Sequence, residues 1–448
     1  MKKNGANMTE GNPIKLILQF AIPVFLGNLF QIFYGLIDTK IVGSTLGESA
    51  LAAVGSVSIL YNLLTGFFNG ITLGFSVVSA RHFGEGDMEK LKRSVAETIL
   101  LGFIIAAIVI TGVFVFLNSI LSAMHVPTEQ RKMAYAYISI LVLGMFITLA
   151  YNMCANILRA IGDSMTPLIF LILAAVLNVI LDYVCILVFS MGVGGAAVAT
   201  VISQMVSVVL CVIHIKKNFP ILQVKRRHFK LKKSEVTAML SGGLSMGMML
   251  SLVNLGTLIL QAGINTLGTS VIVAHTAARK IFEIWGLPLT VLGSTMATYS
   301  GQNYGAGKYD RITSGLKISL ILGCGWAVII LIMAYTISSP LVGFIASTNS
   351  KEILYWGSTY LKVDMIFEVV CVWIVLLRNT MQGIGDYRTP IISSLIEMAC
   401  KIVFTMIFVK YFGYWAVIWT EPITWIIMVI PLIVMLIKNP VLHRKHTA

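Results

Sequence analysis

The chain has 448 residues, of which 57% are hydrophobic and only 12% are charged. Soluble proteins carry about a quarter charged residues, so this composition excludes a soluble protein and indicates a membrane protein. The net charge of +14 does not indicate a nucleic-acid partner, because the basic residues gather in short segments between long apolar runs.

Apolar runs that are long enough to cross a hydrocarbon layer of about 30 Å follow one another along the whole chain. There are twelve, near residues 14–37, 50–79, 95–118, 133–157, 167–190, 193–215, 236–262, 270–298, 314–336, 353–377, 389–411 and 414–437. They leave no room for a soluble domain. We therefore predict an all-α membrane protein with twelve transmembrane helices, placed in the plasma membrane.

The first run carries a stripe of polar residues at spacings of three to four, which puts them on one helix face: Asn28, Gln31, Tyr34 and Asp38. The fifth run carries Asn178 and Asp182, and neither aspartate has a basic neighbour on its own helix. A charge at the membrane centre costs about 3 kcal/mol on insertion scales, so unpaired acids there indicate function.

At 1.5 Å per residue, both aspartates fall in the outer half of the membrane and can meet. Two neighbouring carboxylates cannot both stay charged at low cost, so one takes up a proton or the two share a cation. Asp38 and Asp182 therefore predict a proton or cation site. The alternative is a pair of protonated acids that are hydrogen-bonded for structure alone.

A strongly basic segment at 216–235 follows the sixth run. With a cytoplasmic N-terminus, 24 of the 33 Lys and Arg residues lie in the cytoplasm and five lie outside. The positive-inside rule therefore predicts that both termini and this segment are cytoplasmic, where the segment faces anionic membrane lipids.

The second half of the chain repeats the first. TLGESALAA at 45–53 returns as TLGTSVIVA at 266–274, FGEGDMEK at 83–90 as YGAGKYDR at 304–311, and RAIGDSMTP at 159–167 as QGIGDYRTP at 382–390. We predict two pseudo-symmetric six-helix lobes, 1–215 and 236–448, joined by the linker 216–235, with the substrate site between them. The glycine loops at 83–90 and 304–311 lack the spacing of a phosphate loop and are predicted to be turns between helices.

The second half carries its own acids within apolar runs. Glu283 lies four residues after Arg279, and Glu397 lies four before Lys401, so both are predicted to form ion pairs within a helix. Asp364 and Glu368 share a helix face and remain candidates for a C-lobe site. Glu421, which precedes Pro422, is interpreted as part of a helix break.

Three motifs now carry a resemblance over essentially the whole chain: IPVFLGNLFQIFYGLIDTKIVG at 22–43, GQNYGAG at 301–307 and the doubled GD-x-x-TP. The chain resembles the multidrug and toxic compound extrusion (MATE) transporters. The resemblance implies two six-helix lobes around a central cleft. In the DinF-like branch it implies a cation site for H⁺ or Na⁺, matched here by Asp38, Asn178, Asp182 and Thr200, and cavity residues matched by Gln31, Tyr34, Tyr137 and Asn152.

We expect a cation-coupled antiporter that exports amphipathic or cationic organic compounds by alternating access. It is expected to be a monomer among membrane lipids, with H⁺ or Na⁺ as the coupling ion and no other cofactor. No zinc motif and no pair of nucleophile and base appears within the runs, so we do not expect an enzyme. The alternative is a flippase for a lipid-linked saccharide or another amphiphile, which would favour a basic cavity.

Overall fold

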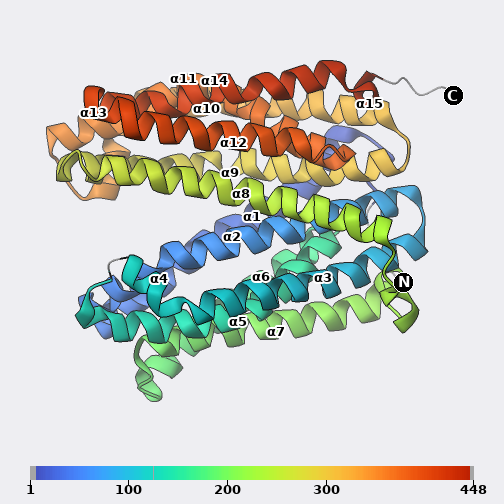
Figure 1. Cartoon of the computed structure of the whole chain (residues 1–448), viewed down its shortest axis with the longest axis horizontal. Coiled ribbons are helices and arrows are strands. Elements are labelled where there is room, and N and C mark those ends of the chain that lie inside the picture. The colour runs from blue at the N-terminus through green and yellow to red at the C-terminus, as the bar shows by residue number, and fades with distance from the viewer. Residues whose placement is uncertain (1–6, 125, 444–448) are drawn as a thin grey trace. The chain divides into compact units, whose positions relative to one another are not determined.

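The computed structural model describes residues 7–124 and 126–443, and this part of the chain is helical without a strand. Twelve helical segments within it are long enough to span a bilayer, counting the short helical turns that continue α6 to Val188 and α12 to Phe412 (Figure 1). They are α1 Pro13–Leu46, α2 Glu48–Glu85, α3 Met88–Val115, α5 Thr128–Ala160, α6 Met165–Tyr183, α7 Gly192–Asn218, α8 Lys233–Ile264, α9 Thr269–Gly305, α10 Tyr309–Ala346, α11 Lys351–Ile384, α12 Arg388–Val403 and α14 Tyr414–Lys438. The predicted all-α membrane fold is confirmed.

Ten of these helices are also apolar enough for a span by composition, among the described residues. The two that are not, α9 and α11, carry charged side chains such as Arg279 and Asp364 in their middle turns. The short elements are α4 Leu117–Ala123, α13 Val409–Phe412, α15 Pro440–His443, the 3₁₀ turns η2 Pro220–Leu222 and η3 Arg226–Phe229, and the π-helical turns η1 Val184–Val188 and η4 Phe404–Phe408.

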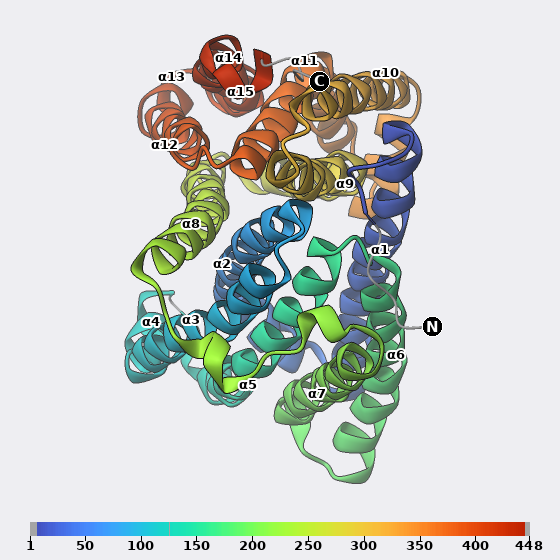
Figure 2. The same ribbon diagram turned by 90° about the vertical axis from the view of Figure 1, so that its right-hand side faces the viewer.

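By packing, the chain divides into two compact units. Unit 1 is formed mainly by Gln19–Gly247, and unit 2 by Met8–Leu18 together with Met248–Ala448. These boundaries differ from the predicted lobes, because the linker and the first half of α8 pack with unit 1. There the linker crosses the N-terminal turns of α3 (Figure 2).

Each unit has its own apolar core. In unit 1, α2 packs on α5, α5 packs on α7, and α3 packs on both α2 and α5. The buried residues Val57, Phe68 and Leu141 belong to its core. In unit 2, α11 packs against α9, α10 and α14, around residues such as Ile281 and Leu361.

The repeated motifs are turns between helices, as predicted. Gly86 follows α2 with a φ of 75°, and Gly307 follows α9 with a φ of 70°. A positive φ costs little only for glycine. Gly162 adopts a φ of 84° after α5, and the carboxylate of Asp163 next to it accepts a hydrogen bond from the backbone N–H of Thr166 at 3.0 Å. The same arrangement recurs at 385–389.

Candidate functional site

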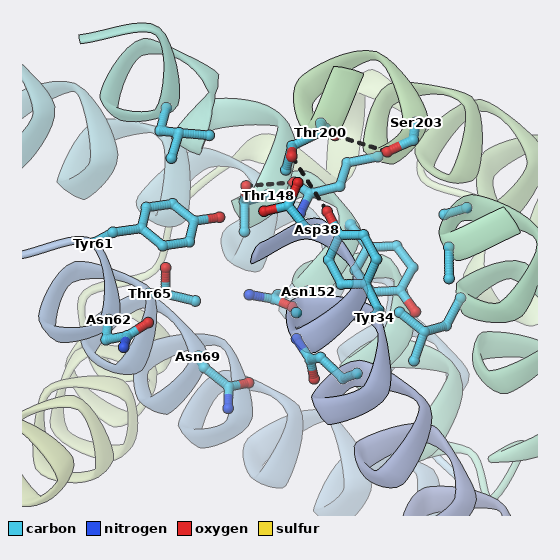
Figure 3. Close-up of a pocket in the computed structure, with 18 of the residues that line it drawn as sticks. Tyr34, Asp38, Tyr61, Asn62, Thr65, Asn69, Thr148, Asn152, Thr200 and Ser203 are labelled. Carbon is cyan, nitrogen blue, oxygen red and sulfur yellow. Dashed lines mark hydrogen bonds between the residues drawn. The ribbon is translucent and has the colours of Figure 1, made fainter. Parts of the chain in front are cut away.

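Unit 1 contains a polar cavity of about 480 Å³ between α1, α2, α5, α6 and α7. Its wall includes four predicted residues on α1 and one on α7: Asn28, Gln31, Tyr34, Asp38 and Thr200. From α5 it includes Tyr137 and Asn152. Figure 3 shows Tyr34, Asp38 and Asn152 directed into this space.

The carboxyl groups of Asp38 and Asp182 are in hydrogen-bonding contact, although they come from different helices, α1 and α6. Two adjacent carboxyls cannot both stay charged at low cost, so the pair either shares a proton or shares a cation. Asp182 is fully buried, with 0% exposure, whereas Asp38 lines the cavity. Asp38 is therefore the member of the pair that an entering ion or substrate meets first.

A network of polar side chains holds this pair. The carboxamide of Asn178, in the orientation that satisfies both its ends, donates to Asp182 Oδ2 at 2.9 Å and accepts from the backbone N–H of Thr200 at 3.1 Å. The Thr200 hydroxyl lies 3.2 Å from the hydroxyl of Tyr34 and donates to the backbone carbonyl of Ala196 at 3.0 Å. Asn178, like Asp182, is fully buried and lies behind the cavity wall.

The helix that carries Asp182 changes geometry immediately after it. The π-helical turn η1 spans Val184–Val188 and continues α6. Such turns widen the helix by one residue and are frequent at functional sites. The matching helix of unit 2 does the same: η4, Phe404–Phe408, follows Lys401 in α12.

Part of the cavity wall was not predicted. On α2, Tyr61, Thr65 and Asn69 follow one another at spacings of four and line the cavity. Figure 3 shows them across from Tyr34. Their polar stripe in an apolar run is the same kind of signal that identified the stripe of α1. Gln204, which accepts a hydrogen bond from Thr148, belongs to a similar stripe on α7, where Thr200, Ser203, Gln204 and Ser207 line the cavity at spacings of three and four.

Asp364 and Glu368 lie in α11 of unit 2 and do not line this cavity. Both are buried, with exposed fractions of 0% and 2%. Asp364 lies beside the hydroxyl group of Tyr360. A C-lobe role for the two acids stays a prediction.

Unit 2 contains a chain of buried ion pairs. Lys401 bridges Glu397 at 3.0 Å, which confirms the predicted pair, and Glu421 at 3.1 Å. Glu397 also accepts from Arg378 at 3.3 Å, and Arg279 lies 3.9 Å from Glu421. The chain therefore joins α9, α11, α12 and α14.

Two predictions about these charges are wrong. The guanidinium of Arg279 lies over the ring of Phe282 and reaches Glu421 instead of Glu283, whose side chain is exposed. Glu421 does not mark a helix break, since α14 continues through Pro422 and the Glu421 carboxylate is an ion-pair partner. Sequence reasoning also missed Glu97, a buried acid with 2% exposure within α3.

Comparisons with known proteins agree with this architecture. The family model MatE matches the chain twice, at residues 23–184 and 245–407. The probable multidrug resistance protein YpnP of Bacillus subtilis is 25% identical over 409 residues, which cover 91% of each chain. The multidrug export protein MepA of Staphylococcus aureus is 23% identical over 422 residues, which cover 94% of this chain and 93% of MepA.

Solved structures share the fold. A transporter of the MOP superfamily from Pyrococcus furiosus, described as having a binding pocket of reverse polarity, aligns with a TM-score of 0.90 at 21% identity. An outward-facing MATE family transporter aligns equally well. Each alignment covers 99% of this chain and 100% of the other.

Proposed function

The chain belongs to the MatE family of multidrug and toxic compound extrusion transporters, and on that premise we propose that it is a cation-coupled antiporter that exports amphipathic or cationic organic compounds by alternating access. It is a multi-pass membrane transporter and not an enzyme. The names of its relatives, a multidrug resistance protein and a multidrug export protein, support export of several compounds.

The observation that carries the coupling is the pair formed by Asp38 and Asp182 at the cavity wall. A shared proton on two adjacent carboxyls changes the charge that a cationic substrate meets: the pair attracts a cation more strongly once the proton has left. Proton binding and substrate binding then compete, and this competition is what an antiporter requires.

We favour H⁺ over Na⁺ as the coupling ion. A sodium site would need several oxygen ligands directed at one point. Both ends of the Asn178 carboxamide, however, are engaged by Asp182 and by the Thr200 backbone, so the amide oxygen keeps only one of its two lone pairs for a cation in this conformation. One charge that moves through 100 mV releases about 2.3 kcal/mol, and a tenfold substrate gradient costs about 1.4 kcal/mol. One proton per cycle is therefore enough.

Transport in proteoliposomes tests this proposal. We expect a pH gradient to drive uptake of the ethyl ester of rhodamine B, a fluorescent organic cation, and a sodium gradient alone to drive none. Asp182→Asn should lose gradient-driven transport while the protein still inserts and folds, because the amide cannot release a proton. Glu129→Gln, at an exposed helix start, is the control and should transport normally. Full active transport by Asp182→Asn would exclude the proposed site.

A flippase for a phosphate-bearing amphiphile is the second candidate. The observation that favours it is the guanidinium of Arg159, which lines the cavity and belongs to the class of groups that bind phosphate in a bidentate manner. A fluorescent phospholipid whose dye is bleached from outside the vesicle distinguishes the two candidates. A flippase moves this lipid between leaflets, whereas an exporter of organic cations does not.

A further inference from the structure

Arg159 lies at the end of the cavity that is remote from the carboxyl pair. On α5, the residues Thr148, Asn152, Ala155 and Arg159 all line the cavity. Their spacings of four, three and four place them on one helix face. Side chains in a helix point back toward its N-terminus, so the guanidinium extends from the last turn of α5 into the cavity.

This guanidinium lacks a carboxylate partner within 4 Å among the residues that the structure describes. Its Nη1 donates to Asn156 Oδ1 at 3.2 Å, and its Nε is buried without a partner. The arginines in the ion-pair chain of unit 2 do have acids: Arg378 pairs with Glu397 and Arg279 with Glu421. A buried N–H donor that stays unpaired is costly, and an anion from outside the protein would remove that cost.

The guanidinium is held in place from a second helix. The Asn156 carboxamide that accepts from Arg159 donates in turn to the hydroxyl of Thr72 on α2 at 2.9 Å. Asn156 and Thr72 are buried, at 2% and 1% exposure. The unsatisfied N–H donor of this guanidinium therefore belongs to a group that is fixed in position and carries a positive charge.

We propose that Arg159 is the receptor for an anionic group, a carboxylate or a phosphate, of an amphiphile that enters the cavity. This proposal rests on the proposed export function, because it names part of the substrate class. The fork of N–H groups on a guanidinium matches the two oxygens of such an anion and binds it in a bidentate manner. The amphiphiles that this site accepts therefore include zwitterionic and anionic compounds, in addition to cations.

The acids of the cavity do not oppose this binding. Tyr137, which lines the cavity near the carboxyl pair, and Arg159 are 22 residues apart on α5, about 33 Å along a helix. At that separation two unit charges interact by only about 0.5 kcal/mol at an effective dielectric constant of about 20. An anion at Arg159 and a proton at Asp38 therefore affect each other's binding only weakly.

The internal repeat supplies the matched variant. Gln382 stands at the position of Arg159 in the second copy of the motif, QGIGDYRTP, and α11 ends there with the same glycine turn. The turn therefore does not require an arginine, and Arg159→Gln installs a residue that this local structure accepts. Arg159→Lys keeps the charge at the end of the helix but removes the fork.

The test uses the full-length protein in detergent and two dyes that differ at a single group: rhodamine B, with a free carboxylate, and its ethyl ester, in which that group is uncharged. Fluorescence anisotropy gives the ratio of the two dissociation constants for each variant. We expect Arg159→Gln to shift this ratio against the free acid by about tenfold or more, and Arg159→Lys to shift it by less. Lys216→Gln, which removes an exposed charge at the end of α7, should leave the ratio unchanged.

A second arm separates the two sources of the anion. Short-chain phosphatidylglycerol and phosphatidylcholine are titrated against the same variants. If only phosphatidylglycerol binding depends on Arg159, the anion is a lipid headgroup. If the dye ratio depends on Arg159, the anion belongs to an organic substrate. If neither depends on Arg159, the proposal is overturned. Transport of the ester driven by the pH gradient is measured separately, so failure of the export function is recognised independently.

Discussion

At the scale of single residues, the ion-pair chain of unit 2 predicts unequal effects for its members. Glu397 is the acid partner of Arg378 in the described structure, and it also holds Lys401. Glu397→Gln leaves Arg378 buried without a carboxylate, and breaking a buried pair in this way costs about 3 to 5 kcal/mol. We expect a marked loss of thermal stability in detergent, measured by size-exclusion chromatography after heating.

Lys401→Met is the matched comparison. In this variant Glu397 keeps Arg378, and Glu421 keeps Arg279, so no charge is left alone. We expect a milder loss than in Glu397→Gln. The reverse order would mean that the lysine, rather than the chain as a whole, stabilises this part of unit 2.

The candidate site was predictable only where the signal is local. Asp38 and Asp182 are conspicuous because each is an acid in an apolar run without a basic neighbour, and the structure brings the two together. The partner of Arg279 was not predictable in this way. Glu421 lies 142 residues further along the chain, and only the packing of α9 near α14 makes it closer than Glu283. The sequence likewise does not predict that Arg159 lacks a carboxylate partner, because this depends on how far the fold places the acidic residues from it.

At the scale of helices, α2 and the first half of α8 approach each other so closely that only glycine fits. A Cβ atom at Gly70 would lie 2.7 Å from the carbonyl oxygen of Met246 and 2.8 Å from the Cα of Gly247. Backbone atoms cannot move aside as side chains do, so Gly70→Ala should separate the two helices and cost about 1 to 3 kcal/mol. A thermal shift of the purified protein measures this loss.

Gly55, in the same helix α2, provides the control. A Cβ atom there meets nothing within 4 Å, and alanine favours a helix over glycine by about 1 kcal/mol. Gly55→Ala should therefore be neutral or stabilising. If both substitutions destabilise the protein equally, the close contact of Gly70 with α8 is not the cause of the loss of stability.

The start of α3 predicts a dependence on pH. Asp87 caps this helix and accepts a hydrogen bond from the backbone N–H of Lys90 at 2.9 Å, and this bond holds the pKa of the Asp87 carboxyl below its usual value. Because the pKa of Asp87 is lower in the folded protein than in the unfolded chain, its carboxylate stabilises the fold at pH values above the ordinary pKa of an aspartate. That stability is lost as the pH falls toward the lowered value.

Asp87→Ala should therefore destabilise the protein by about 1 kcal/mol near neutral pH. Near pH 3 it should have a smaller effect. Asp87→Asn, which keeps the capping oxygen without the charge, should retain most of the stability at both pH values. Thermal denaturation at the two pH values measures the difference, and a loss of the same size at both would exclude a contribution from the charge.

At the scale of the whole molecule, composition and the internal repeat predicted the helical membrane fold. The apolar runs are long and the motifs recur at nearly constant spacing. Both patterns can be recognised from one sequence. The unit boundaries were less accessible, because they depend on packing. The first half of α8 belongs to unit 1 through backbone contacts at Gly70 and Gly74, and an apolar pattern alone does not show which neighbour a helix chooses.

The repeat also shows that function is not duplicated with the fold. The position of Asn178 corresponds to Lys401 in the second copy, and that of Asp182 to Thr405. Both copies continue from the helix into a π-helical turn. In unit 1 the polar residues before this turn surround the pair of carboxyls formed by Asp38 and Asp182. In unit 2 the residues before the turn belong to the chain of ion pairs. The two units therefore share this helix geometry, but at the aligned positions only unit 1 carries a pair of titratable carboxyls.

The orientation of the molecule in the membrane yields the last prediction. The basic linker at 216–235 and most Lys and Arg residues fall between helices on one side, which under the positive-inside rule is the cytoplasm. Ser234 and Glu129 are both exposed and lie on opposite sides in this topology. We expect an impermeant maleimide, added to intact cells, to label Glu129→Cys and to leave Ser234→Cys unlabelled until the cells are opened. The unmodified chain, whose six cysteines all lie within helices, supplies the blank. If Ser234→Cys were labelled from outside while Glu129→Cys stayed protected, the topology would be inverted. Arg159 would then lie at the exterior end of the cavity, and it would bind the proposed anion as the substrate leaves the protein instead of as the substrate enters from the cytoplasm.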